Sequence, residues 1–223
     1  VSRLLVSPLG GVLRRRHERY LLGLARAFDR SDFDSALRQA IALGGGAASA
    51  GLTVRLPRPR LGALGPSPTL PGATPSLATP LNAYAYLREL YEQAASHLEH
   101  LDRIDEAAFV RADLMGAPLD AVRLLERHGR RVLAAELADG RLLDPALVVR
   151  LWWQAGRRDR AIDVARVRGG LDGAARQLDD VDPEAALLLR RQWVQQLLVA
   201  GAVVTAVRIA WPFPPLREVV LPH

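Results

Sequence analysis

The chain contains no cysteine and no lysine, and only 5% of its residues are aromatic. Without cysteine it can form no disulfide, no thiolate metal site and no thiol nucleophile. Without lysine, the glycine run at residues 44–46 cannot act as a phosphate-binding loop of the Walker type, which needs a lysine and a hydroxyl residue. These absences exclude several classes of enzyme before any pattern is considered.

Negative charge is scarce in one part of the chain. Residues 1–60 hold 11 arginines against four acidic residues, whereas residues 61–223 hold 19 arginines against 20 acidic residues. The net charge of +6 therefore belongs to the N-terminal part. Arg14, Arg15, Arg16 and Arg19 could line a helix face that contacts phosphates, which makes nucleic-acid binding one candidate function. The alternative is a solvated helix face in a protein with an arginine-biased composition.

A short pattern occurs five times and is the main signal in this sequence. We call its reference position the turn residue, and the five turn residues are Ser31, Asp102, Gly129, Gly156 and Gly201. Five residues after each of them stands an alanine, namely Ala36, Ala107, Ala134, Ala161 and Ala206. Nine residues after the turn residue, four copies have alanine again, and Arg111 is the exception. In the last four copies a bulky apolar residue precedes the turn residue by four positions: Leu98, Leu125, Trp152 and Leu197.

This pattern is typical of stacked helical hairpins. Glycine at the turn suits the left-handed backbone that ends many helices, and alanines four residues apart share one helix face on which a second helix can lie closely. The sequence therefore predicts an all-α fold, an α-solenoid of short hairpins. The array is expected to be irregular, because the interval between Gly156 and Gly201 breaks the 27-residue spacing of the preceding turn residues.

Composition divides the chain into four regions. We expect a basic helical pair at 1–43, a Pro/Gly-rich linker at 44–80, a helical-repeat domain at 81–211, and a tail at 212–223 that could lead to a further domain. Short strands are possible at 52–56 and 217–221. The expected helices of the repeat domain are 82–101, 103–115, 119–128, 130–139, 145–155, 157–168, 172–179, 184–200 and 202–211.

The repeated pattern resembles tetratricopeptide-like repeats, although its spacing is shorter than the 34 residues of that class. Three runs, LRELYEQAASHLEHLDRIDEAAFVRADLM, AVRLLERHGRRVLAAELADG and VVRLWWQAGRRDRAIDVAR, also resemble the helical region of bacterial β-propeller proteins. Those proteins belong to ternary systems with a MoxR-type ATPase and a von Willebrand A-domain protein. The resemblance implies a scaffold whose partner is a β-propeller domain or a MoxR-type ATPase system.

The sequence offers no catalytic set and no residues for a cofactor or a metal. His97 and His100 lie three residues apart on one expected helix, but no third ligand stands at a suitable spacing. Trp153 is the most distinctive candidate, because it lies one step around the helix from the inward-facing Trp152. It either packs against a neighbouring repeat or is exposed as a partner-binding anchor, flanked by Arg150 and Arg157.

The leading hypothesis is a non-catalytic scaffold for protein–protein interaction, and nucleic-acid binding through Arg14, Arg15, Arg16 and Arg19 is the alternative. No segment resembles a signal peptide, so we expect a cytoplasmic protein without a membrane segment. The most apolar stretch, residues 193–213, is interrupted by polar residues and fits a buried hairpin better than a membrane span.

Overall fold

The computed structural model describes residues 19–43, except Leu21, Asp29 and Ser31, and residues 60–69 and 81–222. Every regular element in these residues is helical, which confirms the all-α prediction. The chain divides into two compact units, residues 1–128 and 129–223. This boundary lies inside the region that the sequence predicts as one helical-repeat domain.

The first unit is built around the longest helix of the described chain, α3 (Leu81–His100). It packs against α4 (Ile104–Phe109), which continues directly into a π-helical turn, η2 (Val110–Leu114). Helix α5 (Pro118–Arg127) then packs against both α4 and η2. Helix α2 (Phe33–Gln39) precedes them, and Asp32 caps it by accepting the amide of Ser35 at 3.3 Å.

Three contacts dock the N-terminal helical segment on α3. The hydroxyl of Tyr91 accepts the Ile41 amide at 3.1 Å and donates to the Ile41 carbonyl at 2.8 Å. The ring of Phe28 meets the Tyr91 ring edge-on, and that of Phe33 stacks on His97. Burial raises the pKa of the Tyr91 phenol, so the hydroxyl stays protonated and able to donate.

Residues 60–69, the described part of the expected linker, are held in place by polar contacts. The Arg60 guanidinium donates to the carbonyls of Leu37 and Ala40, at 3.1 and 2.7 Å, where α2 ends. The amide of Ser67 donates to Asp113 at 3.0 Å. This segment is therefore a packed loop of the first unit, and the expected strand at 52–56 lies outside the described residues.

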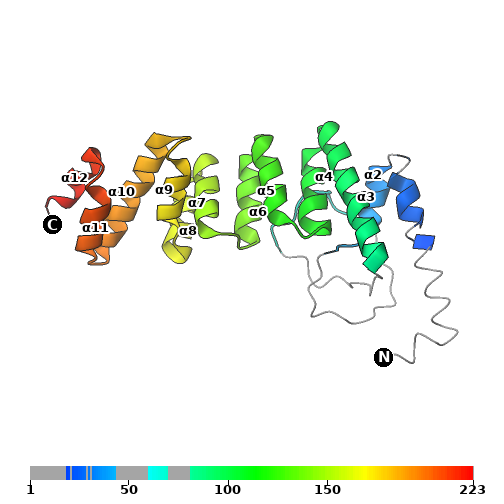
Figure 1. Cartoon of the computed structure of the whole chain (residues 1–223), viewed down its shortest axis with the longest axis horizontal. Coiled ribbons are helices and arrows are strands. Elements are labelled where there is room, and N and C mark those ends of the chain that lie inside the picture. Colours follow the sequence, from blue (N-terminus) through cyan, green and yellow to red (C-terminus); the bar gives the residue numbers. More distant parts are fainter. Residues whose placement is uncertain are drawn as a thin grey trace, which may run out of the picture. The chain divides into compact units, whose positions relative to one another are not determined.

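In the second unit, consecutive helices pack against each other from α6 to α8 and again from α9 to α12 (Figure 1). In addition, α7 contacts α9, and α10 contacts α12. The helices are α6 (Arg131–Gly140), α7 (Pro145–Gln154), α8 (Arg158–Arg168), α9 (Leu171–Leu178), α10 (Pro183–Val199), α11 (Val203–Ala210) and α12 (Pro214–Val220). Their bounds agree with the expected helices to within one residue up to α11. Sequential contacts of this kind are consistent with stacked hairpins.

The backbone at the turn residues repeats almost unchanged. Asp102, Gly129, Gly156 and Gly201 have left-handed φ angles between 57° and 76°. The next residue in each case has φ between −94° and −79° and ψ between 52° and 63°. In three copies its amide also donates to the carbonyl of the bulky residue before the turn, at 2.8–2.9 Å; these pairs are Arg103–Leu98, Arg157–Trp152 and Ala202–Leu197. This bond defines a Schellman motif, which gives the sequence spacing a backbone cause.

The alanines after each turn are buried, as the pattern predicts. Those five residues on, Ala36, Ala107, Ala134, Ala161 and Ala206, are at most 1% exposed. Arg111 breaks the pattern nine residues on because it lies in the π-helical turn, which accommodates one extra residue. Its neighbour Ala112 takes the inward place and is 1% exposed.

The expected strand at 217–221 is wrong, because residues 214–220 form helix α12. Pro214 stands in the first turn of this helix, where a missing amide hydrogen costs nothing. Leu216 and Val220 lie four residues apart on one helix face and are 1% and 4% exposed in the core shared with α10 and α11. Burial of that face overrides the strand propensity of the valines.

We predict that Gly170→Ala destabilises the second unit far more than Gly156→Ala. A Cβ at Gly170 would lie 2.7 Å from the backbone of Pro145 and Ala146, whereas nothing lies within 4 Å of one at Gly156. The Gly156 variant should lose about 1 kcal/mol from its left-handed conformation alone, and the Gly170 variant should lose more than about 3 kcal/mol. Urea unfolding measures both, and equal losses would contradict the close approach of α9 to the start of α7.

Candidate partner-binding surface

Trp153 is buried, so the interpretation of this residue as an exposed anchor is wrong. Trp152 and Trp153 are each 8% exposed. Adjacent residues on a helix point in different directions, but α7 contacts α6, α8 and α9, so both indoles meet a neighbour. The guanidinium of Arg158 covers the Trp153 ring, with 5.2 Å from its central carbon to the ring centroid. The alternative expectation, packing within the repeats, is the one the structure bears out.

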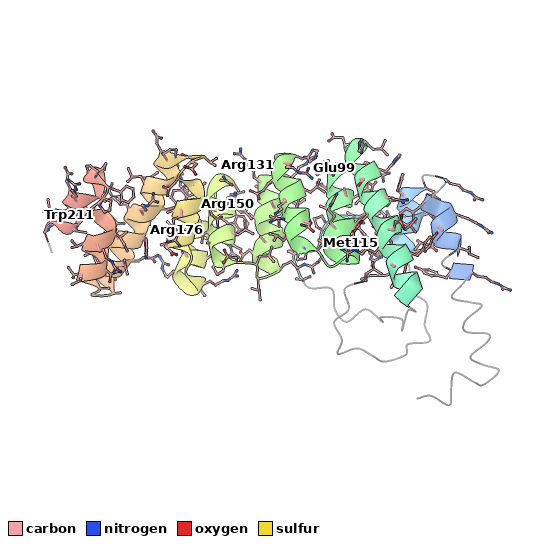
Figure 2. All side chains as sticks on the ribbon, viewed as in Figure 1. Glu99, Met115, Arg131, Arg150, Arg176 and Trp211 are labelled. Carbon is pink, nitrogen blue, oxygen red and sulfur yellow. The ribbon has the colours of Figure 1, made fainter. Side chains whose placement is uncertain are left out.

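Arg150 ties two helices together at the surface of the second unit. Its guanidinium donates to the side-chain oxygens of Gln154, at 2.8 Å, and of Gln177 on α9, at 3.0 Å. Arg131 of α6 reaches the carbonyl of Gln154 at 3.5 Å. Figure 2 labels Arg131, Arg150 and Arg176, which come from α6, α7 and α9. We call the connected set Arg131, Gln154, Arg150 and Gln177 the Arg150 row.

Arg157, the third predicted residue of this surface, is exposed in the turn between α7 and α8. Its side chain makes no capping hydrogen bond at the start of α8. It follows Gln154, a member of the Arg150 row, by three residues. A cationic side chain at this place can contact a partner without first losing an internal ion pair.

A second polar cluster in this unit has a structural role. The carboxylate of Asp139 accepts the Trp152 indole N–H at 3.2 Å, Arg160 at 3.2 Å and Arg168 at 3.4 Å. Its side chain is only 15% exposed. One carboxylate thus links α6, α7 and α8, and its donors hold it in place. Nothing in the sequence spacing signals this cluster.

An ion pair with a nearly buried arginine joins the end of α9 to α10. Both terminal nitrogens of Arg190 donate to the two carboxylate oxygens of Asp179 at 2.5 Å. Arg190 is only 8% exposed, and its guanidinium also lies over the ring of Phe213, 4.4 Å from the centroid. The hydrogen bond from Arg190 and its charge lower the pKa of Asp179. This pair connects α9, α10 and the segment before α12.

The first unit gathers three basic side chains around a single carboxylate. Glu99 lies 3.1 Å from Arg127, 3.3 Å from His128 and 3.5 Å from Arg111 (Figure 2 labels Glu99). The side chain of Glu99 is 22% exposed. These contacts join α3 to η2 and to the end of α5, so their evident role is to cross-link successive helices.

The described residues contain no group of three or more histidines, aspartates or glutamates placed to hold a metal. His97 stacks on Phe33, and the ring nitrogen Nδ1 of His100 lies 2.7 Å from the Ser96 carbonyl. Both line a shallow depression on α3 together with Glu92, Gln93 and Ser96.

Two further expectations concern phosphate contacts and membranes. Arg14, Arg15 and Arg16 lie outside the described residues, whereas Arg19 is described and exposed. Only one of these four arginines is among the described residues, so nucleic-acid binding stays a prediction. None of the described helices combines the length and the apolar composition that crossing a bilayer requires.

Comparisons with other proteins identify no relative. No protein-family model matches the chain, and neither a curated protein nor a solved structure matches it.

We predict that Asp179→Ala lowers the stability of the second unit more than Asp172→Ala. The two aspartates are equally exposed, so the difference lies in their partners: removing Asp179 leaves the nearly buried Arg190 guanidinium without its carboxylate, at a cost of about 1–3 kcal/mol. Asp172 pairs with Arg176 in solvent, with side chains 41% and 69% exposed, so its loss should cost under about 1 kcal/mol. Urea unfolding at neutral pH compares the two variants, and similar losses would contradict a structural role for the Asp179 pair.

Proposed function

We propose that this chain is a non-catalytic scaffold for protein–protein interaction, built from helical hairpins. The recurrence of one turn geometry followed by buried alanines is the observation that supports it. Hairpins stacked in this way place equivalent surface positions of successive helices side by side, which suits binding along several helices. The polar clusters around Glu99, Asp139 and Asp179 join neighbouring helices and so help to maintain the packing of the hairpins.

The surface that best fits this function is the Arg150 row with Arg157 beside it. Its side chains come from α6, α7 and α9, and the row is connected through Gln154 and Gln177. Arginine is enriched in protein interfaces because its planar guanidinium can form several hydrogen bonds at once. Trp153 is buried within the unit, so it supports the packing of α7 but is not an exposed anchor for a partner.

The resemblance to helical regions of bacterial β-propeller proteins suggests the partner. On this proposal the scaffold works with a β-propeller domain or a MoxR-type ATPase system. The likeness rests on three sequence runs within residues 82–211, and no comparison adds to it. The contribution of this unit would be positioning, with any chemistry performed elsewhere.

We predict that Arg157→Glu weakens partner binding about tenfold, because it reverses an exposed charge beside the Arg150 row. The measurement is affinity capture from a bacterial lysate with the purified chain, followed by titration of the captured protein. Arg30→Glu is the control, since Arg30 is likewise an exposed arginine in a turn but belongs to the first unit. Unchanged affinity in the Arg157 variant would remove this surface from the proposal, and failure to capture any protein would contradict the scaffold function.

A further inference from the structure

Helix α11 exposes an apolar face with one arginine in it. Val204 is 84% exposed, Trp211 directly after the helix is 55% exposed, and Arg208 lies exposed between them. These residues stand four and three positions apart, so they form one stripe along the helix. The opposite face carries Ala206 and Ala210, both fully buried. The helix thus carries apolar side chains on two faces. One face is buried in the second unit, and the other is exposed.

Earlier copies of the repeat bury positions that remain open in the last one. Eight residues after the turn residue, Val110, Leu137 and Val164 are 0%, 1% and 6% exposed, whereas Ile209 is only partly buried. Four residues before it, Leu98, Leu125 and Trp152 are at most 8% exposed, and Leu197 is again only partly buried. The layer formed by α10 and α11 therefore has incomplete cover where its equivalents are closed.

The helix that follows explains the difference. Leu137 of α6 is buried beside α7, which has 10 residues. The corresponding neighbour of α11 is α12, which has 7 residues and stops before Pro222. Proline disfavours helical backbone at the residue before it, so α12 does not extend further over α11. A further helix would give α11 the cover that α7 provides for α6.

The charge in this part of the chain is mostly positive. Residues 185–218 contain four arginines and one acidic residue, Glu218. Arg190 is engaged with Asp179, while Arg191 and Arg208 are exposed and form no ion pair with a described residue. Arg217 lies over the Trp211 ring at 5.4 Å and donates to the Trp211 carbonyl at 2.8 Å, which fixes the indole in place. A partner here must accept apolar contact and supply negative charge.

We infer that the exposed stripe of α11, formed by Val204, Arg208 and Trp211, binds an acidic amphipathic α-helix of a partner protein. This inference rests on the proposed scaffold function and names one surface and one partner chemistry for it. A helix matches the cover that earlier copies receive, and its apolar stripe would lie along the stripe of α11. Carboxylates flanking that stripe would pair with Arg208. A second copy of this chain would instead bring arginines against arginines, which disfavours it.

The test uses two synthetic helical peptides of about five turns. Both carry leucine along one face, and their flanking residues are glutamate in one peptide and lysine in the other. Fluorescence anisotropy measures binding of each labelled peptide to the whole chain. The glutamate peptide should bind at least about tenfold more tightly than the lysine peptide, because only its charge complements the arginines.

Three variants locate the binding. Val204→Asp should abolish binding of the glutamate peptide, and Arg208→Glu should reverse the preference between the two peptides. Val167→Asp is the matched control, because Val167 on α8 is also 84% exposed and also stands beside arginines. It should leave binding unchanged, and circular dichroism with urea unfolding should show that all three variants fold as the parent chain does.

Several results would overturn the inference. These are equal affinity for both peptides, binding of neither peptide, and binding that survives Val204→Asp. The inference would also be overturned if sedimentation showed a dimer that Val204→Asp dissociates. The same holds if the chain bound phosphatidylserine vesicles but neither peptide. If Arg157→Glu weakens capture of a protein while neither peptide binds, the scaffold function stands and only the α11 site fails. If no protein is captured and no peptide binds, both proposals fail.

Discussion

The close approach of two helices directly after a left-handed turn is the constraint on which the rest of this molecule depends. At Gly156 the chain reverses, the Arg157 amide bonds back to the Trp152 carbonyl, and α8 begins one residue later. The outgoing helix then lies so near the incoming one that only a small side chain fits between them. Ala161 occupies that place with no exposed surface. The left-handed turn and the alanine five residues after it are both needed for this close approach of the two helices.

Polar contacts then connect one helix to the next instead of forming an enclosed reactive centre. Asp139 joins three helices of the second unit, and Arg190 joins α9, α10 and the segment before α12. Glu99 does the same in the first unit. Such cross-links fix the spacing of the helices and leave their outward faces available. That division of roles is what the scaffold proposal needs, and the open face of α11 gives it a specific place to act.

Most of the fold could be predicted from patterns in neighbouring residues, whereas contacts between residues distant in the sequence could not. The turn glycines and the alanines after them recur at fixed spacings, so helices α3 to α11 follow from the sequence. The burial of Trp153 depends on α7 being packed against three other helices, α6, α8 and α9, which no local pattern reveals. Helix α12 was predicted as a strand because its valines favour sheet, and only their packing on α10 and α11 decides otherwise. The Asp179–Arg190 pair spans 11 residues without any characteristic motif.

The account is tested most directly by the stability of Ala161→Leu compared with Ala200→Leu. Ala161 is fully buried after its turn, whereas Ala200 is exposed just before Gly201. Urea unfolding should show a loss of about 1–3 kcal/mol for the Ala161 variant, because the larger side chain forces the two helices apart. The Ala200 variant should change by less than about 0.5 kcal/mol. Equal effects of the two substitutions would contradict the claim that small residues after the turn hold the hairpins together.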